Sequence, residues 1–547
     1  MKKIDWLIIV LIFFLSIITL RNFFQPGFYT SHDGIHQVVR LYYFNQALSD
    51  GQIPPRWAGG LLNGYGYPLF VFSYQLPWLL AQPFRLLNFS VFESIKAVFI
   101  FGYFFSGLAM YLYLKKIVGR GAGLVGTVIY LFAPFRFSNI FVRAAIGDAT
   151  VFIFPPFLFL SLYSLQIKNK ISWPWIVLGA VSLSGMLLSH AMVFLFYFFA
   201  FWLYCLFITV FRKKIKLIIP SVIITILTFG LSAYYFLPSF TEKNLTKFSQ
   251  IMGPAHLGQY FLSLKELVYS TWGYGVMRAQ EGAMSLQLGF AQWLSVILFL
   301  LLVLFLHKKI KRKSFFQESL FFLVLFVITI FLMLPVSKIF WQSISRIMVI
   351  DFPWRILSLS VFTSSVLAGF FIAGLPNKRL KFIFGFILIF LAFYANRNHL
   401  RINQVLDWPL DFYLKLERTT NTYDEYTPKW VNFDVNKKAL SKIETSIPST
   451  DLKIKEERSN YLSFTLDLPK ETKVRINTIY YPGWEVFVDE VPTAIQYDQG
   501  VIEFPVKAGK TEVVSRFRET PLRLFSDFLS VLTLSVIIFG FYKFKKL

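Results

Sequence analysis

The sequence predicts a mainly α-helical protein that crosses a membrane about twelve times and carries an all-β domain before its last helix. Of 547 residues, 56% are hydrophobic and 19% aromatic, with a mean hydropathy of +0.56. A soluble core cannot bury that much apolar surface. Apolar runs of about 20 residues alternate with short clusters of Lys and Arg, as in membrane proteins with several spans. After about residue 395, segments of alternating polar and apolar residues replace the long apolar runs.

The net charge of +25 fits a membrane protein better than a nucleic-acid-binding one. Its basic residues lie in clusters between apolar runs, which is the pattern of cytoplasmic loops and not of a phosphate-binding face. We therefore expect no nucleic-acid partner. The single cysteine, Cys205, lies inside an apolar run, so the sequence predicts neither a disulfide framework nor a thiolate metal site.

The first span is expected at the N-terminus. Lys2 and Lys3 precede about 18 apolar residues without a small-residue cleavage site, which favours an uncleaved helix with its amino end in the cytoplasm. The basic clusters give each later span its direction and place the carboxyl end of this cell-membrane protein in the cytoplasm too. The later spans are expected at Phe92 to Leu114, Leu124 to Ile140, Val151 to Leu165, Trp173 to Leu188, Met192 to Phe211, Leu217 to Leu237, Leu286 to Leu306, Leu320 to Trp341, Ile356 to Leu375, Phe382 to Tyr394 and Leu524 to Tyr542.

The apolar stretch Pro68 to Leu87 is nearly long enough to span, but it contains prolines, glutamines and an arginine. A span here would reverse the direction of every later basic cluster, so we expect an interfacial or re-entrant helix. The expected domains are a transmembrane domain over 1–395 with outer loops 24–91 and 238–285, an extracytoplasmic β-sandwich over 396–520, and a final helix with a basic tail over 521–547.

The β domain is predicted from short segments with period-two patterning. They are KIKEERSNYLSFTLDL, TKVRINTIYY, WEVFVDEVPTAIQY, VIEFPV and TEVVSRFR. Turn signals separate them, such as Pro482-Gly483 and Asp498-Gln499-Gly500. Several strands of this kind within roughly 80 residues indicate a small antiparallel sandwich.

Asp33 is the first candidate catalytic residue, because a carboxylate held at a membrane surface is costly and usually functional. It could take the proton of an acceptor or hold a divalent cation, with His32 and His36 orienting it or sharing the metal. The alternative is structural: Ser31 or Asp33 would cap the helix that follows, since both residue types suit that position.

Asp148 is the second candidate, in the sequence FVRAAIGDATVF. By the predicted topology it faces the same side as Asp33. A helix cap with a salt bridge to Arg143 would also explain it.

Arginines on the predicted outer side form a third pattern, because orientation signals do not require them there. An arginine can donate two hydrogen bonds to a phosphate at once, although snorkelling toward lipid headgroups is the alternative. Arg278 and Arg355 are the strongest candidates of this set, which comprises Arg40, Arg56, Arg136, Arg143, Arg278, Arg346 and Arg355.

The histidines show no metal signature. The sequence contains no HExxH, paired CxxC or GxSxG motif, so a zinc hydrolase and a serine hydrolase have little support. His190, in LLSHAMVF, is expected at the outer end of a helix, either as a hydrogen-bonded interface residue or within reach of the outer site.

Several motifs carry a resemblance to a known family: SHDGIHQVVR, GQIPPRW, NGYGYPLFVFSYQLP, RAAIGD, FPWR, YDEYTPKW, YYPGWEVFVDE and TPLRLFSD. They resemble bacterial multi-spanning membrane proteins of the 6-pyruvoyl-tetrahydropterin-synthase-related and YfhO-like type. That group is similar to the GT-C superfamily of glycosyltransferases, which use polyprenyl-phosphate sugars. The resemblance implies an acidic residue in the first outer loop, at Asp33, and another in the second, at Asp148, while Glu281 could match an acid of a later loop.

The first loop carries a single acid and not an acidic pair, which leaves open whether Asp33 and Asp148 hold a metal. The function predicted from the residues and the resemblance is transfer of a sugar from a polyprenyl-phosphate carrier to an extracytoplasmic glycan, lipid or protein. Asp33 and Asp148 would be catalytic. The residues expected to contact substrate are His32, His36, Arg56, Arg143, His190, Arg278, Glu281 and Arg355.

Two alternatives come from other classes. A transporter or flippase for lipid-linked glycans would need polar residues deep in the spans, where Phe, Leu, Ile and Val predominate. A non-catalytic assembly protein would need only a stable fold and a surface for partners.

Overall fold

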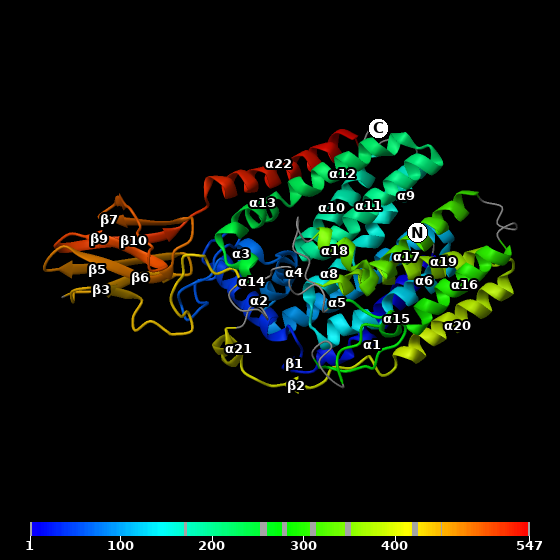
Figure 1. Cartoon of the computed structure of the whole chain (residues 1–547), viewed down its shortest axis with the longest axis horizontal. Helices are drawn as coiled ribbons and strands as arrows, with labels where there is room; N and C mark the ends of the chain where they lie inside the picture. The colour runs from blue at the N-terminus through cyan, green and yellow to red at the C-terminus, as the bar shows by residue number, and fades with distance from the viewer. Residues whose placement is uncertain are drawn as a thin grey trace.

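The computed structural model describes residues 3–168, 172–251, 260–275, 282–306, 313–344, 352–417, 425–449 and 451–544. Helices form a bundle along most of the long axis, and β-sheets lie beyond one end of it (Figure 1). The last helix, α22 (Pro521–Phe544), runs from the β-sheets back along α13 (Ala233–Glu242) and α12 (Ile218–Leu231).

Within the described residues, seven helical segments are long and apolar enough to cross a membrane. They are Val91–Val118, Ile146–Ile167, Ala191–Arg212, Ser314–Met333, Pro353–Gly374, Lys378–Asn396 and Pro521–Lys543. Two bent pairs, each counted as one span, raise the number to nine. The chain is therefore a multi-pass membrane protein, as predicted. The predicted number of about twelve spans is not shown. The N-terminal helix α1 (Lys3–Thr19), α10 (Trp173–Ser189) and α16 (Phe290–Leu306) have 17 residues each, just under the length of a counted span.

Most of the other helices either form part of one of these segments or are short helices within loops. They are α2 (Gly34–Ser49), α3 (Leu69–Phe72), α4 (Leu76–Leu86), α5 (Val91–Val118), α6 (Arg120–Leu131), α7 (Pro134–Phe137), α8 (Ile146–Val151), α9 (Phe154–Lys168), α11 (Ala191–Arg212), α14 (Phe248–Ile251), α15 (Leu264–Val268), α17 (Lys313–Met333), α18 (Lys338–Ile344), α19 (Leu357–Gly374), α20 (Lys378–Asn396) and α21 (Leu410–Leu416).

Both bent pairs break at a residue that suits a helix end. The first bends by 47° between α6 and α7, where Pro134 supplies no backbone N–H to continue the helix. The second bends by 73° at Ser232, between α12 and α13. In the first pair the chain continues past α7 into a π-helical turn, Ser138–Val142, which leads into the candidate site.

Several basic helix ends meet at one end of the bundle. Asp5 of α1 is fully buried there and pairs with Lys115 of α5 at 2.9 Å and with Arg120 of α6 at 2.8 Å. The Trp173 indole, at the start of α10, donates to the Ile537 carbonyl near the end of α22 at 3.1 Å. The amino-terminal end of α1 thus lies beside basic residues of α5 and α6, and α22 contacts the start of α10.

The stretch Pro68 to Leu87 forms no helix long enough to span. It consists of α3 and α4, which are separated by Ser73–Gln75, and the 11 residues of α4 extend only about 16 Å. Two leucines at the end of α4 are 82% and 68% exposed, Leu86 and Leu87. They form an apolar tip beside Arg85, as in a helix that lies at a membrane surface.

A β-sheet region before the last helix is confirmed. Its strands are β3 (Ile443–Thr445), β4 (Lys453–Arg458), β5 (Tyr461–Leu468), β6 (Thr472–Ile479), β7 (Trp484–Val488), β8 (Val491–Thr493), β9 (Val501–Val506) and β10 (Gly509–Phe517). They form two antiparallel sheets, in the orders β4-β5-β10-β7-β8 and β3-β6-β9. Alternate residues of both sheets belong to one buried cluster, for example Phe464, Val513 and Phe504.

The first loop, residues 24–91, joins the two parts of the molecule. Its residues Trp57, Tyr65 and Phe72 belong to the buried cluster of the β-sheets. At its start, β1 (Phe28–Tyr29) pairs antiparallel with β2 (Val405–Leu406), which follows α20. The loop is therefore fixed at both parts, and its helix α2 extends between them.

Candidate functional site

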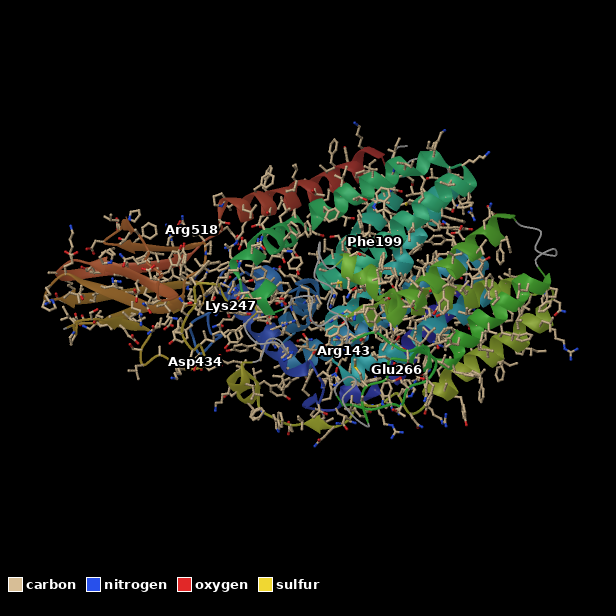
Figure 2. All side chains as sticks on the ribbon, in the orientation of Figure 1. Arg143, Phe199, Lys247, Glu266, Asp434 and Arg518 are labelled. Atoms are coloured by element: carbon tan, nitrogen blue, oxygen red, sulfur yellow. The ribbon has the colours of Figure 1, made fainter. Side chains whose placement is uncertain are left out.

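Ends of helices and loops from four regions of the sequence meet around Asp33. The backbone N–H groups of His32 and Asp33 donate to the carbonyls of Val142 and Arg143, at 3.0 and 2.8 Å. These bonds hold the start of α2 against the turn between the π-helical segment and α8. Figure 2 shows Arg143 within the helical part, away from Asp434 and Arg518 on the side of the β-sheets.

The turn after Arg143 depends on an unusual backbone. Ala144 has φ +54°, a left-handed conformation, and its carbonyl accepts from the Gln37 side chain at 3.1 Å. At Gly147 an added Cβ would lie 2.5 Å from the Ser189 carbonyl, so only glycine allows α8 to approach the end of α10 this closely.

Asp148 is the centre of the ion pairs. Arg355 Nη1 donates to both of its carboxylate oxygens, at 3.1 and 2.8 Å, and Arg143 Nη1 donates to Oδ2 at 3.1 Å. Asp148 does not cap α8, because the N-cap position belongs to Ala145. Of the structural alternative, a helix cap with a salt bridge to Arg143, the salt bridge is present and the cap is not. A carboxylate that is only 5% exposed is stabilised here by two charge-assisted partners.

Asp33 has a different environment. It occupies the N-cap position of α2 but makes no capping hydrogen bond with its side chain. Its carboxylate lies 3.8 Å from Arg143 Nη2 and 4.0 Å from His36 Nδ1, and it is 19% exposed. The guanidinium of Arg143 thus lies between the two carboxylates, close to Asp148 and beyond hydrogen-bond distance from Asp33.

Two histidines are held in defined tautomers. His190 separates α10 from α11, and Arg355 Nη1 lies 2.7 Å from its Nε2. Since an arginine can only donate, that nitrogen accepts. His32 Nε2 lies 3.0 Å from the Tyr274 carbonyl and must donate. Burial lowers the pKa of His32 below its ordinary value of 6.5, so this ring is neutral at pH 7.

Aromatic rings complete the site. Trp354, 2% exposed, lies under both guanidinium groups, at 4.9 Å from that of Arg143 and 5.5 Å from that of Arg355. Tyr74 stacks on His190, with the ring centres 6.3 Å apart. The same ring lies under Arg40, one helical turn beyond His36, at 5.5 Å. These contacts fix the cations in place by cation–π attraction.

The structure therefore brings together Asp33, His32, His36, Arg143, Asp148, His190 and Arg355. We call Asp33, Arg143, Asp148, His190 and Arg355 the loop-end network. Sequence reasoning missed Tyr74, Gln37, Asn139 and Trp354. Trp354 adjoins Arg355 in the FPWR motif, and this position could have indicated that it belongs to the site. Asn139, whose Oδ1 accepts from Arg143 at 2.7 Å, lies inside an apolar run that gives no such signal.

The remaining residues proposed to contact substrate are Arg56, Arg278 and Glu281. Arg278 and Glu281 lie outside the described residues. Arg56 is described but lies at the junction with the β-sheets, where it bonds Glu519 at 3.0 Å and Asp527 at 2.7 Å. Arg56 is 1% exposed, and its guanidinium donates to these two carboxylates and to the Tyr234 carbonyl. These contacts do not support the prediction that Arg56 contacts substrate.

A second pair at the same junction is formed by Arg523 and Glu242, with bonds of 2.9 and 2.7 Å. Tyr481 donates to the same glutamate at 2.8 Å. Together with the partners of Arg56 they link the first loop, α13, the β-sheets and α22. We call Arg56, Glu242, Glu519, Arg523 and Asp527 the junction network.

The residues present do not fit a divalent cation held between Asp33 and Asp148. Arg143 lies where such an ion would bridge the two carboxylates, and both oxygens of Asp148 accept from arginines. Among the described residues there is no group of three His, Cys, Asp or Glu side chains that could hold a metal. The chemistry of the site is therefore derived from its own side chains.

Comparison with known proteins identifies no family. No family model matches the chain. An uncharacterized protein of Lactococcus lactis subsp. cremoris (strain MG1363) is 24% identical over 247 residues, which are 43% of this chain and 40% of that protein. The cryo-EM structure of the arabinofuranosyltransferase AftD from Mycobacteria matches with a TM-score of 0.44 and 10% identity, over 73% of this chain and 27% of that one. The chain spans less than half of the length of either protein, and these matches do not confirm the YfhO-like type.

Proposed function

We propose that the chain is a membrane glycosyltransferase which transfers a sugar from a polyprenyl-phosphate donor to an extracytoplasmic glycan, lipid or protein acceptor. The observation that supports this most is the loop-end network. It gathers two carboxylates, two arginines and a histidine from loop and helix ends that are far apart in the sequence. Ionisable groups are expensive near a membrane and are usually functional there. The motif resemblance described above points to the same class.

In the proposed reaction, Asp33 is the general base. It accepts the proton of the acceptor hydroxyl as that oxygen forms a bond to the anomeric carbon. The bond from that carbon to the phosphate oxygen breaks on the opposite face, and the configuration inverts. The polyprenyl phosphate leaves with the electron pair. General base catalysis typically contributes about 10²–10⁴-fold to the rate.

Asp148 has a different proposed role from Asp33. Both of its carboxylate oxygens accept hydrogen bonds from arginines, and it fixes Arg143 and Arg355 beside Asp33. Positive charge held there in advance would stabilise the negative charge that develops on the leaving phosphate. His32, His36 and His190 would orient the carboxylates and the substrate.

We further propose a topology of twelve spans with both termini in the cytoplasm. The nine spans counted with the bent pairs would be joined by α1, α10 and α16. The basic ends that meet beside Asp5 would then face the cytoplasm, as the positive-inside rule requires. The loop-end network and the β-sheets would face outward, with the exposed apolar tip of α4 in the lipid interface near the donor's prenyl chain.

The test is transfer by the purified full-length chain in lipid nanodiscs, supplied with polyprenyl-phosphate sugars and a cell-envelope acceptor extract. Release of polyprenyl phosphate is measured for the wild type, for Asp33→Asn and for Asp411→Asn, an exposed aspartate of α21 that serves as a matched control. We expect release by the wild type and the control and a loss of about 10²-fold or more in Asp33→Asn.

Equal release by all three proteins would remove Asp33 from the mechanism. Absence of release with movement of the labelled lipid across the bilayer would favour a transporter. Absence of both would favour an assembly protein.

A further inference from the structure

Two segments that are far apart in the sequence present exposed apolar side chains beside the start of one span, α5. The first segment is the turn between α4 and α5, where Leu86, Leu87 and Phe89 are exposed. The second is α21 with the residues before it, where Trp408 and Phe412 are 38% and 39% exposed. We call these five residues the apolar collar.

Ring contacts hold α21 against the first turn of α5. The ring centre of Tyr413, a buried residue of α21, lies 5.2 Å from that of Phe92, the second residue of α5. The ring centre of Trp408 lies 6.0 Å from that of Tyr413 and 4.3 Å from that of Phe412. These aromatic rings therefore connect the start of the span with the exposed side chains of the second segment.

The start of α5 lies at a membrane surface, whichever direction the span takes. Its 28 residues extend about 42 Å, whereas the hydrocarbon core of a bilayer is about 30 Å thick. Glu93 and Lys96 lie in the first two turns, and the stretch without charged residues follows them. The extra length and the two charges place these turns among the lipid headgroups. The apolar collar adjoins them and is therefore at the same level.

The turn between α4 and α5 is closed by its own hydrogen bonds. The backbone N–H groups of Asn88 and Phe89 donate to the carbonyls of Arg85 and Phe84, at 3.0 and 3.1 Å. The Arg85 side chain donates to the Phe89 carbonyl. Because these polar groups are bonded within the turn, it can present its two leucines to lipid without leaving them unpaired.

The second segment is apolar on both sides. Leu410, Tyr413 and Leu414 pack on the core of the helical part, while Trp408 and Phe412 are exposed. A helix whose outer side faces water usually carries polar residues there. Tryptophan is enriched where a membrane meets water, because its ring is apolar and its N–H is polar. The exposed side of this segment therefore suits a lipid interface better than water.

We propose that the apolar collar binds the surface of the lipid bilayer, with its side chains among the headgroups and the upper acyl chains. A partner protein could also cover apolar side chains. Lipid is favoured because the collar adjoins a span, so that lipid already lies beside it. This inference rests on the collar and on α5, and not on the proposed function.

Its consequence for the loop-end network does rest on the proposed function. Val405, which precedes Trp408 by three residues, pairs in β2 with Tyr29 of β1, and Asp33 follows Tyr29 by four residues. The start of α2 would thus lie near the lipid headgroups. The phosphate of a lipid-linked donor lies at that level, so it could reach the network without leaving the membrane surface.

The experiment measures the membrane depth of single nitroxide labels on the full-length chain in lipid nanodiscs, by EPR power saturation with oxygen and with a water-soluble nickel chelate. Cys205→Ser first removes the single native cysteine. Leu86→Cys and Phe412→Cys then report on the two parts of the collar. Phe386→Cys, exposed inside the spanning helix α20, is the lipid control, and Val491→Cys, exposed in β8, is the water control.

We expect both collar labels to lie about 5–10 Å deep at the boundary of headgroups and acyl chains. They should collide with oxygen more often than the Val491 label, and the Phe386 label should lie deeper than either. All four labelled proteins should keep the thermal midpoint of the Cys205→Ser chain, because the labelled side chains are exposed.

A second measurement uses a natural ring of the collar. The fluorescence of Trp408 is obtained as the difference between the wild type and Trp408→Phe in the same nanodiscs. We expect lipids brominated near the acyl carbonyl to quench this difference, and iodide in the water to leave it unquenched.

A collar label with the water accessibility of Val491, or at the depth of Phe386, would overturn the proposal. Quenching of Trp408 by iodide and not by brominated lipid would do the same, and would leave a partner protein as the occupant. Asp33→Asn should leave the label depths unchanged. If it also transferred sugar like the wild type, the proposed function would fail and membrane binding by the collar would stand.

Discussion

The loop-end network and the junction network use the same residue types, buried arginines and carboxylates, with different surroundings. In the junction network, Arg56 and Arg523 are 1% and 0% exposed, and each is bonded directly to its carboxylates at 2.7 to 3.0 Å. In the loop-end network only Asp148 is bonded in this way. Asp33 lies 19% exposed at the rim, 3.8 Å from Arg143 and beside His36.

Under the proposed function, a buried arginine and an acid do not by themselves make a reactive site. Direct hydrogen bonds from an arginine suit a carboxylate to a structural role, because its charge is already compensated. Asp33 lies at the rim and its side chain is more exposed than that of Asp148, so under the proposed function an acceptor hydroxyl has more access to it. On this account the junction network holds the molecule together and the loop-end network performs the chemistry.

The largest effect is expected for Asp148→Asn. The change leaves Arg143 and Arg355 buried without a compensating charge, which we expect to lower the free energy of unfolding by about 3–5 kcal/mol. Transfer should be lost as well, because the arginines are no longer fixed beside Asp33. Thermal midpoints and transfer rates in nanodiscs measure the two effects. An unchanged midpoint would contradict the assignment of Asp148 as the centre of the network.

The next effect is expected for Arg523→Lys in the junction network. A lysine keeps the charge but cannot make both bonds to Glu242, and the loss of one charge-assisted hydrogen bond should cost about 2 kcal/mol. The specific transfer rate of the folded protein should remain that of the wild type. A specific rate reduced tenfold or more at an unchanged midpoint would mean that the two networks do not divide the roles as argued here.

A smaller effect is expected at Ala144, whose φ of +54° shapes the turn after Arg143. Ala144→Val places a β-branched side chain in a left-handed conformation and should cost about 1–2 kcal/mol. Ala144→Gly is the matched control and should be neutral or slightly stabilising. Equal midpoints for the two variants would show that this turn is not fixed in the way described.

A pH-dependent effect is expected outside both networks. Burial lowers the pKa of Lys442 from its ordinary 10.5 to about 8. Between these values the unfolded chain holds a proton on this amine that the folded chain has released, so stability should rise with pH from about 8 to 10.5. Lys442→Met should remove that part of the rise in the thermal midpoint. The same slope in both proteins would show that the amine is not buried when the protein is folded.

The sequence was sufficient to predict the class of fold, because apolar runs and basic clusters are local features of a chain. The membrane helices and the β-sheet region before the last helix are confirmed. The number of spans depends on α1, α10 and α16, because each has 17 residues, just under the length of a counted span.

The site was predictable in its ionisable residues and not in their contacts. Asp33, Asp148 and Arg355 stand out in the sequence because charges are rare beside apolar runs. Arg143 lies between the two aspartates because of the turn at Ala144. Trp354 lies under two guanidinium groups because of tertiary packing. Neither arrangement is visible in the sequence. Arg56 looked equivalent to the other arginines because its partners, Glu519 and Asp527, lie more than 450 residues away.

The most direct test of the division between the two networks is the surface-glycan profile of cells that carry a single changed carboxylate. Asp33→Asn and Glu519→Gln are compared at equal expression by mass spectrometry of the envelope glycans. The account predicts that Asp33→Asn loses the glycan made by the wild type, while Glu519→Gln keeps it. A wild-type profile in Asp33→Asn, or the same loss in both strains, would contradict the account.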